Sequence, residues 1–327
     1  MEIVFCADKK VLPGLHVAAY SLLAQLRGRL AKTRIHVFSD ELDANDAALL
    51  EKTLVGANRP FQLGLHRLDP VSFKAFSPLN GSWTTYYRLL VPENLHVDRY
   101  LYVDVDSVCD VDISEVEDLK MNRAAVAWAP EAPLSRAVDR QTAEKLGKSQ
   151  SDHYFNAGVM LINVPEWRRQ RVSERAMEYI ISDRPEFHDQ AALNYVLHGT
   201  AMTLHPKFNC IANMRKNWPA LKKPYGQIGR LVHFVDYPKP WDLGAEFLHP
   251  QYHLWQSVVD QTALAGFRSW HNTQARKWPQ TRKAWLGYKK ALKDRLLFAG
   301  YSRGWLKQVK GVPAVDSCNP GYSSPRL

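Results

Sequence analysis

Residues 99–112 read "RYLYVDVDSVCDVD", and the fold class follows from how this stretch ends. An apolar run stops at two aspartates, Asp104 and Asp106, which stand one residue apart. Alternate residues of an extended segment point the same way, so both carboxylates can face one point beyond the strand. Like charges held together disfavour ionisation unless a cation lies between them, and hard oxygen ligands suit Mg²⁺ or Mn²⁺. The alternative is a solvated acidic turn, because short Asp-rich turns are common.

The chain around this stretch alternates strand-like and helical segments. Apolar runs typical of buried strands lie at 2–7, 34–40, 61–68, 99–106, 124–129, 154–164 and 230–241. Helical periodicity is found at 12–26, 45–55, 82–95, 167–181 and 189–199. This alternation predicts an α/β fold with a central, mostly parallel sheet flanked by helices. Ligands of such sheets bind beyond the carboxyl ends of the strands, which is where Asp104 and Asp106 stand.

Composition separates the chain into two parts. Its 327 residues are 46% hydrophobic and 23% charged, as in globular proteins, and its net charge is +10. Residues 276–310 hold eleven Lys or Arg and one acid, which equals that whole excess. The main body is therefore neutral and has no general affinity for polyanions, so no nucleic-acid partner is expected. We predict a main domain at 1–250 and a small basic, Trp-rich helical extension at 251–327.

A second apolar strand delivers polar groups that suit a mixed metal site. The segment "VHFVDYPKPW" places His233 at a strand end and Lys239 six residues later. An imidazole added to two carboxylates favours Mn²⁺ over the purely oxygen-liking Mg²⁺. Lys239, between two prolines that restrict its loop, can meet a phosphate as a point charge. Taken alone, a histidine at a strand end more often bonds to backbone.

Five segments together resemble the family 8 glycosyltransferases, and most closely the bacterial lipo-oligosaccharide and lipopolysaccharide galactosyl- and glucosyltransferases. These segments lie in the family's order over about the first 245 residues: "IVFCADKKVLPGLHVAAYSLL", "TTYYRL", "RYLYVDVDSV", "YFNAGVMLINVPEWR" and "HFVDYPKPW". The resemblance implies a Rossmann-like GT-A fold for residues 1–250. It also implies transfer of galactose or glucose from a UDP-sugar with retention of configuration, assisted by Mn²⁺, with Mg²⁺ as the second choice.

The resemblance assigns roles to residues of this chain. Asp104, Asp106 and His233 would bind the metal through the Asp-x-Asp motif and the imidazole. Lys239 would neutralise the diphosphate, and Asp8 would accept a hydrogen bond from the uracil or ribose. The other donor-binding positions are Cys6, Ala7, Arg88, Asp104, Val105, Asn156 and Ala157. Asp189 and Gln190 match positions that hold the sugar and face its anomeric carbon.

Gln190 bears on the mechanism that the resemblance implies. Retention by double displacement needs a nucleophile, normally a carboxylate, on the face opposite the leaving group. Because a glutamine amide is a poor nucleophile, we favour front-face attack, in which the departing phosphate takes the acceptor's proton. The carbonyl oxygen of Gln190 would then stabilise positive charge at the anomeric carbon.

Two positions depart from the family pattern. Asp236 stands where the loop after the metal histidine usually carries a glycine, which lets backbone approach the diphosphate. An aspartate there would repel the phosphates or turn outward. Ala191 replaces the second acid of a usual Asp-Gln-Asp segment, which removes a structural or sugar contact.

Two other functions remain open from the sequence. A metal-dependent phosphohydrolase could use the same aspartate pair, but would need more clustered carboxylates. A non-catalytic, membrane-associated UDP-sugar-binding scaffold is the other. The acceptor would be a glycan or glycolipid held by variable loops, here 129–153 and 212–230. We expect a cytoplasmic protein, peripheral on the inner face of the cytoplasmic membrane.

The basic extension predicts contact with an anionic membrane through 276–310. Trp278, Trp285 and Leu292 recur every seven residues, with Tyr288 and Leu296 beside them, so one helical stripe is apolar. Tryptophan and basic residues favour the boundary of an anionic bilayer. Prolines and glycines at 279, 287 and 300 predict two or three short helices in place of one. An enzyme shortened after Trp270 is expected to keep donor hydrolysis and lose vesicle binding.

Overall fold

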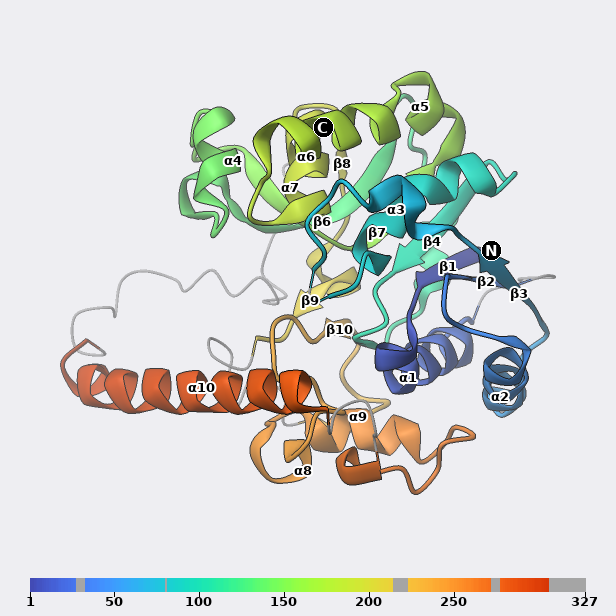
Figure 1. The fold of residues 1–327 in the computed structure, drawn as a ribbon, viewed down its shortest axis with the longest axis vertical. Coiled ribbons are helices and arrows are strands. Elements are labelled where there is room, and N and C mark those ends of the chain that lie inside the picture. Colours follow the sequence, from blue (N-terminus) through green and yellow to red (C-terminus); the bar gives the residue numbers. More distant parts are fainter. Residues whose placement is uncertain (28–32, 80, 214–222, 272–276, 306–327) are drawn as a thin grey trace.

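A seven-stranded sheet carries the fold in this computed structural model (Figure 1). The structure describes residues 1–27, 33–79, 81–213, 223–271 and 277–305, with side chains described as far as 293. The strands lie in the order β3 (Phe61–Arg67), β2 (Thr33–Ser39), β1 (Glu2–Cys6), β4 (Arg99–Val103), β7 (His153–Asn163), β6 (Val126–Pro133) and β8 (Met202–Thr203). Only β7 runs against its neighbours, so the predicted mostly parallel sheet is confirmed.

Helices cover both faces of this sheet (Figure 1). One face carries α1 (Leu12–Ala24) and α2 (Ala44–Val55). The other carries α3 (Thr84–Asn94), α5 (Val164–Arg169), α6 (Val172–Asp183) and α7 (His188–Val196), with α4 (Arg140–Lys145) beside α7. Alternation along β1 explains the two layers, since Ile3 and Phe5 pack toward α1 while Val4 and Cys6 pack toward α3.

A small three-stranded sheet extends the structure below the carboxyl end of β4. It contains β5 (Ser107–Cys109), β10 (Leu231–His233) and β9 (Cys210–Ile211) in that order. Helix α9 (Tyr252–Val259), preceded by the short α8 (Ala245–Leu248), packs against α1, with Trp255 fully buried in the same cluster as Val17. The division predicted at residue 250 therefore marks a change in composition, and the packing continues across it.

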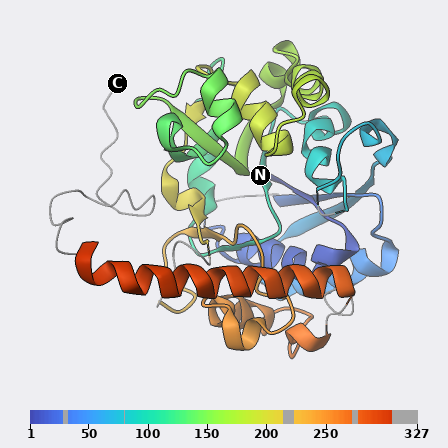
Figure 2. The ribbon, with the colours of Figure 1, turned by 60° about the vertical axis from the view of Figure 1, so that its left-hand side comes forward.

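Residues 278–305 form one helix, α10 (Trp278–Trp305), so the prediction of two or three short helices for the basic segment is wrong within the described residues (Figure 2). Pro279 does not break this helix because it lies in the first turn, where a backbone N–H needs no partner within the helix. Gly287 is accommodated because the helix approaches another segment closely there. A Cβ at this position would lie 2.6 Å from the carbonyl oxygen of Tyr237.

The predicted apolar stripe of α10 is present in part. Trp278, Trp285 and Leu292 are 73%, 58% and 59% exposed, which leaves this flank of the helix open. Tyr288 does not belong to the open flank, because it is partly buried beside Gly244. The side chain of Leu296 lies outside the described residues. None of the helices within the described ranges is both long and apolar enough to cross a membrane.

Candidate active site

Strand pairing brings the two aspartates and the histidine together. Asp104 directly follows β4, and its backbone N–H donates to the carbonyl of Gly158 in the neighbouring β7, at 2.7 Å. The chain then turns through Asp106 into β5, which pairs antiparallel with β10 so that Ser107 stands opposite His233. Residues far apart in sequence thus meet at the carboxyl end of β4.

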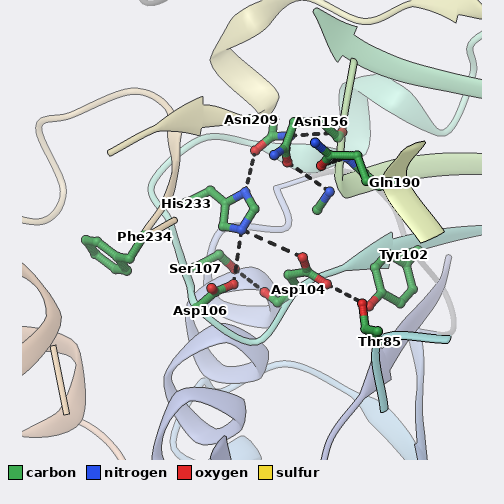
Figure 3. A network of polar contacts seen from close by, with 12 residues as sticks. Thr85, Tyr102, Asp104, Asp106, Ser107, Asn156, Gln190, Asn209, His233 and Phe234 are labelled. Carbon is green, nitrogen blue, oxygen red and sulfur yellow. Dashed lines mark hydrogen bonds and ion pairs between the residues drawn. The ribbon is translucent and has the colours of Figure 1, made fainter. Parts of the chain in front are cut away.

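These three side chains form a compact cluster (Figure 3). The Nε2 atom of His233 lies 3.1 Å from Oδ1 of Asp106 and 3.7 Å from Oδ2 of Asp104. One ligand atom from each residue lies within 4.8 Å of the others. The imidazole is buried, whereas the carboxylates are partly open to a cavity. The cluster predicted from "YVDVDSV" and "VHFVD" is therefore assembled in the fold.

A chain of hydrogen bonds behind the imidazole fixes its tautomer. The backbone N–H of Gly158 donates to Oδ1 of Asn156 at 2.9 Å, so that oxygen is an acceptor. The contacting atom of Asn209 must then be its NH₂ group, 3.0 Å away. Its Oδ1 consequently faces Nδ1 of His233 at 3.0 Å and accepts the proton carried there. In the neutral imidazole the second nitrogen, Nε2, is therefore a lone pair aimed at the two carboxylates.

Three acceptors that converge in this way suit a cation. An imidazole lone pair and two carboxylate oxygens repel one another unless positive charge lies between them. The chemistry matches a site for a divalent ion with mixed oxygen and nitrogen ligands, held by an outer hydrogen bond to the histidine. Burial alone would raise the pKa of Asp106, but the charge of Lys239 opposes this shift and the pKa lies well below its usual value.

Gly158 leaves the space that the imidazole occupies. A Cβ on this residue would lie 2.1 Å from Cε1 of His233 and 2.9 Å from Oδ1 of Asn156. No side chain can therefore be placed there without moving the imidazole. The glycine of the "FNAG" segment is thus a structural requirement of the candidate metal cluster.

Arg88 links the cluster to the predicted catalytic residues. Its Nη2 donates to Oδ1 of Asp104 at 2.8 Å and its Nη1 to the carbonyl of Ala157 at 2.6 Å. Its Nε lies 3.1 Å from Oδ2 of Asp189. Tyr102 also donates to Oδ1 of Asp104, at 2.7 Å. Arg88 therefore orients a carboxylate of the candidate metal cluster, and it also borders the cavity.

The predicted catalytic pair lies at the start of α7. Asp189 is 3% exposed and accepts a hydrogen bond from Thr85 at 2.7 Å, besides its ion pair with Arg88. Burial raises the pKa of Asp189, and the charge of Arg88 opposes that shift. Gln190 accepts from the backbone N–H of Ala157 at 3.1 Å through its carbonyl oxygen. Figure 3 shows Gln190 beside Asn156, on the far side of the imidazole from Asp106.

Lys239 reaches the cluster from the loop after β10. Its Nζ lies 2.5 Å from Oδ2 of Asp106 and donates to the carbonyl of Phe234 at 2.5 Å. Its backbone N–H donates to Asp242 at 2.7 Å. Burial raises the pKa of Asp242 to about 6. The positively charged ammonium of Lys239 is thus held where the carboxylate of Asp106 borders the cavity.

A cavity of about 360 Å³ opens onto these groups. Of the predicted donor-binding residues, those that border it are Cys6, Asp8, Arg88, Asp104, Val105 and Lys239. Ala7 is fully buried and donates its N–H to the carbonyl of Phe38, which holds this segment in the sheet. Asp8 accepts from the N–H of Lys10 at 2.9 Å, and burial raises the pKa of the Cys6 thiol.

The structure explains both departures from the family pattern. Asp236 has φ = 64°, the left-handed conformation that glycine adopts without strain and that aspartate tolerates. Its carboxylate accepts a hydrogen bond from Asn213 at 2.5 Å. Ala191 is fully buried, so an acid there would need a buried partner.

Several residues of the site were not predicted. Gly158 stood in a quoted segment without a role, and Asn209 gave no signal because nothing local marks it as a partner of a histidine 24 residues away. Thr85 and Tyr102 are also new, each bonded to a predicted acid. Gln280 of α10 borders the cavity as well, far from the segments that carry the resemblance.

Comparison with known proteins agrees with the predicted fold and family. The model of "Glycosyl transferase family 8" matches residues 2–244. The galactosyltransferase LgtC, solved with donor and acceptor sugar analogs, superposes with a TM-score of 0.66 at 24% identity, covering 80% of this chain and 96% of LgtC. The fold is therefore that of the GT-A glycosyltransferases. The chain belongs to glycosyltransferase family 8 and is a glycosyl-transfer enzyme.

Curated relatives include bacterial lipopolysaccharide enzymes. A lipopolysaccharide 1,3-galactosyltransferase of Salmonella typhimurium is 27% identical, over 77% of this chain and 76% of its own length. A lipopolysaccharide 1,2-glucosyltransferase of Escherichia coli is 28% identical, with 75% and 74% covered. General stress protein A of Bacillus subtilis is 26% identical, with 76% and 90% covered.

Proposed function

We propose that this enzyme transfers galactose or glucose from a UDP-sugar, with retention of configuration, to a glycan or glycolipid of the bacterial surface. The single observation that carries the proposal is the Asp104, Asp106 and His233 cluster at the wall of a cavity that also holds Lys239. The names of the lipopolysaccharide-modifying relatives support the sugar and acceptor classes.

Asp104, Asp106 and His233 would hold Mn²⁺, or Mg²⁺ as the second choice. The ion would supply Lewis-acid stabilisation of the charge that builds on the departing diphosphate. Lys239 lies against Asp106 and can turn its ammonium to a phosphate oxygen, since it is a point charge on a flexible stem. Arg88 keeps Asp104 oriented from the other side. These residues bind and orient the leaving group before any bond breaks.

The contacts of Asp189 support front-face attack over double displacement. A nucleophilic carboxylate needs an oxygen that faces the anomeric carbon, but Asp189 is buried, accepts a hydrogen bond from Thr85 through Oδ1, and holds Oδ2 3.1 Å from Nε of Arg88 in an ion pair. Gln190 uses one lone pair of its carbonyl oxygen on Ala157, which leaves the second for positive charge at the sugar. The acceptor's proton would then pass to the departing phosphate.

The open flank of α10 supports peripheral attachment to an anionic membrane on the cytoplasmic side. Trp278, Trp285 and Leu292 are exposed in a row, and basic residues are abundant on the same helix. Tryptophan prefers the headgroup level of a bilayer, and Lys and Arg are attracted to an anionic surface. Attachment would bring the cavity to a lipid-linked acceptor.

The test is a donor screen by UDP release with Mn²⁺, followed by transfer to defined glycolipid acceptors and determination of the product's anomeric configuration. Asp106→Asn should lower turnover at least about 100-fold, the scale of losing a group that stabilises developing charge. Asp98→Asn, an exposed acid just before β4, is the matched control.

Three results would each decide against part of the proposal. Full activity in EDTA would exclude the metal role. UDP binding without transfer would favour the non-catalytic scaffold. Release of inorganic phosphate from simple phosphate esters would favour a phosphohydrolase.

A further inference from the structure

The first turn of α10 forms part of the cavity that holds the metal cluster. Gln280 borders this cavity together with Lys10, Val11 and Tyr237. It is partly buried, whereas the residues at 277–279 are exposed. Figure 2 shows α10 crossing the body of the enzyme at its N-terminal half and projecting beyond it at its C-terminal half. The cavity is thus bordered in part by a segment outside the region matched by the family model, which ends at 244.

Close packing holds this part of α10 against the loop that carries Lys239. Ala284 and Ala291 are 3% and 4% exposed, and Gly287 lies between them on the same face. A Cβ on Gly287 would lie 2.6 Å from the carbonyl oxygen of Tyr237 and 2.8 Å from Cδ of Pro238. Only small residues therefore fit along this face, and the backbone of the helix rests on the backbone of the loop.

Charged and aromatic groups connect the same two segments. Nζ of Lys283 lies 5.7 Å from the ring centre of Tyr237, and Nζ of Lys239 lies 5.6 Å from the same ring centre. Burial and the charge of Lys10 lower the pKa of Lys283, while Asp242 opposes that shift. Lys10 and Lys239 border the cavity, and Lys283 lies close to Tyr237, which borders it as well. An anionic ligand there would relieve their repulsion.

We propose that α10 is a wall of the donor site, and that Gln280 contacts the bound nucleotide-sugar while the docked helix positions the loop of Lys239. The inference rests on the proposed nucleotide-diphosphate donor. It assigns to the extension a role in donor affinity that is separate from its exposed flank. Gln280 is the donor-contacting residue, and Gly287 is a positioning residue because it acts through the loop.

The experiment compares UDP binding and donor KM in the full-length enzyme and three variants. Gln280→Ala should weaken UDP-sugar binding about 3- to 10-fold, the effect of losing one hydrogen bond. Gly287→Leu should raise donor KM about tenfold or more, because the new side chain separates α10 from the loop. Leu286→Ala is the matched control, since this neighbour on the same helix is 43% exposed. It should bind UDP as the parent does.

The possible results separate the two proposals. Unchanged UDP-sugar affinity in Gln280→Ala, with a parent enzyme that binds UDP, would overturn the inference and leave the proposed donor intact. A parent enzyme that binds no UDP would defeat the proposed donor and the inference together. Gln280→Ala is a truncation at a partly exposed position, so it tests the wall directly even if Gly287→Leu fails to fold. A raised donor KM in Gln280→Ala and in Gly287→Leu, with kcat near the parent value in each, would support the inference.

Discussion

Replacing Asn209 by Leu tests whether the tautomer of His233 is set by the chain of amides behind it. Leucine has a similar size but removes the acceptor 3.0 Å from Nδ1 and the donor to Asn156. The imidazole proton then has no fixed position, and Nε2 no longer stays a lone pair aimed at the carboxylates. Loss of such an outer partner weakens metal affinity by about 10- to 100-fold, or ~1.4–2.8 kcal/mol.

The assay is the Mn²⁺ concentration that gives half-maximal activity, together with direct Mn²⁺ binding measured by calorimetry. Asn194→Ala is the control, because Asn194 is equally buried and bonds to the backbone of Phe155 at 2.8 Å. That variant should lower stability without changing Mn²⁺ affinity. An Asn209→Leu enzyme with the parent's Mn²⁺ dependence would refute the argument from hydrogen-bond direction.

Three further outcomes are expected. Gln190→Ala should lower kcat roughly 100-fold and leave UDP affinity within a few-fold, as for a group that acts mainly in the transition state; a covalent sugar trapped on Asp189 would contradict this. The pKa of Asp242 is raised from 3.8 to about 6 in the fold. The free energy of unfolding should therefore fall by up to ~3 kcal/mol as the pH rises between those two values, because the folded protein disfavours the ionised carboxylate. Asp242→Asn should therefore raise Tm at pH 8, with the gain disappearing below about pH 4 in a thermal-melt series. Trp285→Ser should weaken sedimentation with anionic vesicles at low salt roughly tenfold, whereas Val55→Ser, an equally exposed apolar site on α2, should not.

The central sheet could be predicted because its signals are local. Buried runs of alternating strands and helices need only near neighbours to be recognised, and β1, β2, β3 and β4 formed as parallel strands where the sequence indicated. The direction of β7 could not be read in this way, since an apolar strand has the same pattern whichever way it runs. The prediction that α10 would be broken into short helices was wrong because Gly287 is needed for close packing against Tyr237, a residue far away in the sequence.

The residues of the candidate site likewise fall into two groups: those that a local sequence pattern could predict and those that depend on distant neighbours. Asp104 and Asp106 were readable because a strand end places them, and His233 because a second strand ends beside them. Asn209 was not, since its two partners lie 24 and 53 residues away and meet it only through β9 and β7. The sequence left open whether Asp236 repels the phosphates or turns outward, because its direction depends on a left-handed backbone and on Asn213. In the fold Asp236 borders the cavity. A local sequence pattern cannot predict the role of a residue when that role depends on neighbours that are distant in sequence.

We assign different tasks to the two faces of helix α10, and this changes how its function must be tested. Its small residues rest on the loop of Lys239 while Trp278 and Trp285 point away from the domain. An enzyme shortened after Trp270 loses both faces, so reduced donor hydrolysis in it would follow from the missing wall as readily as from misfolding. The expectation that such an enzyme keeps donor hydrolysis treats the extension as an anchor alone. Substitutions confined to one face separate the tasks, because Trp285→Ser leaves the packed face intact and Gln280→Ala leaves the exposed flank intact.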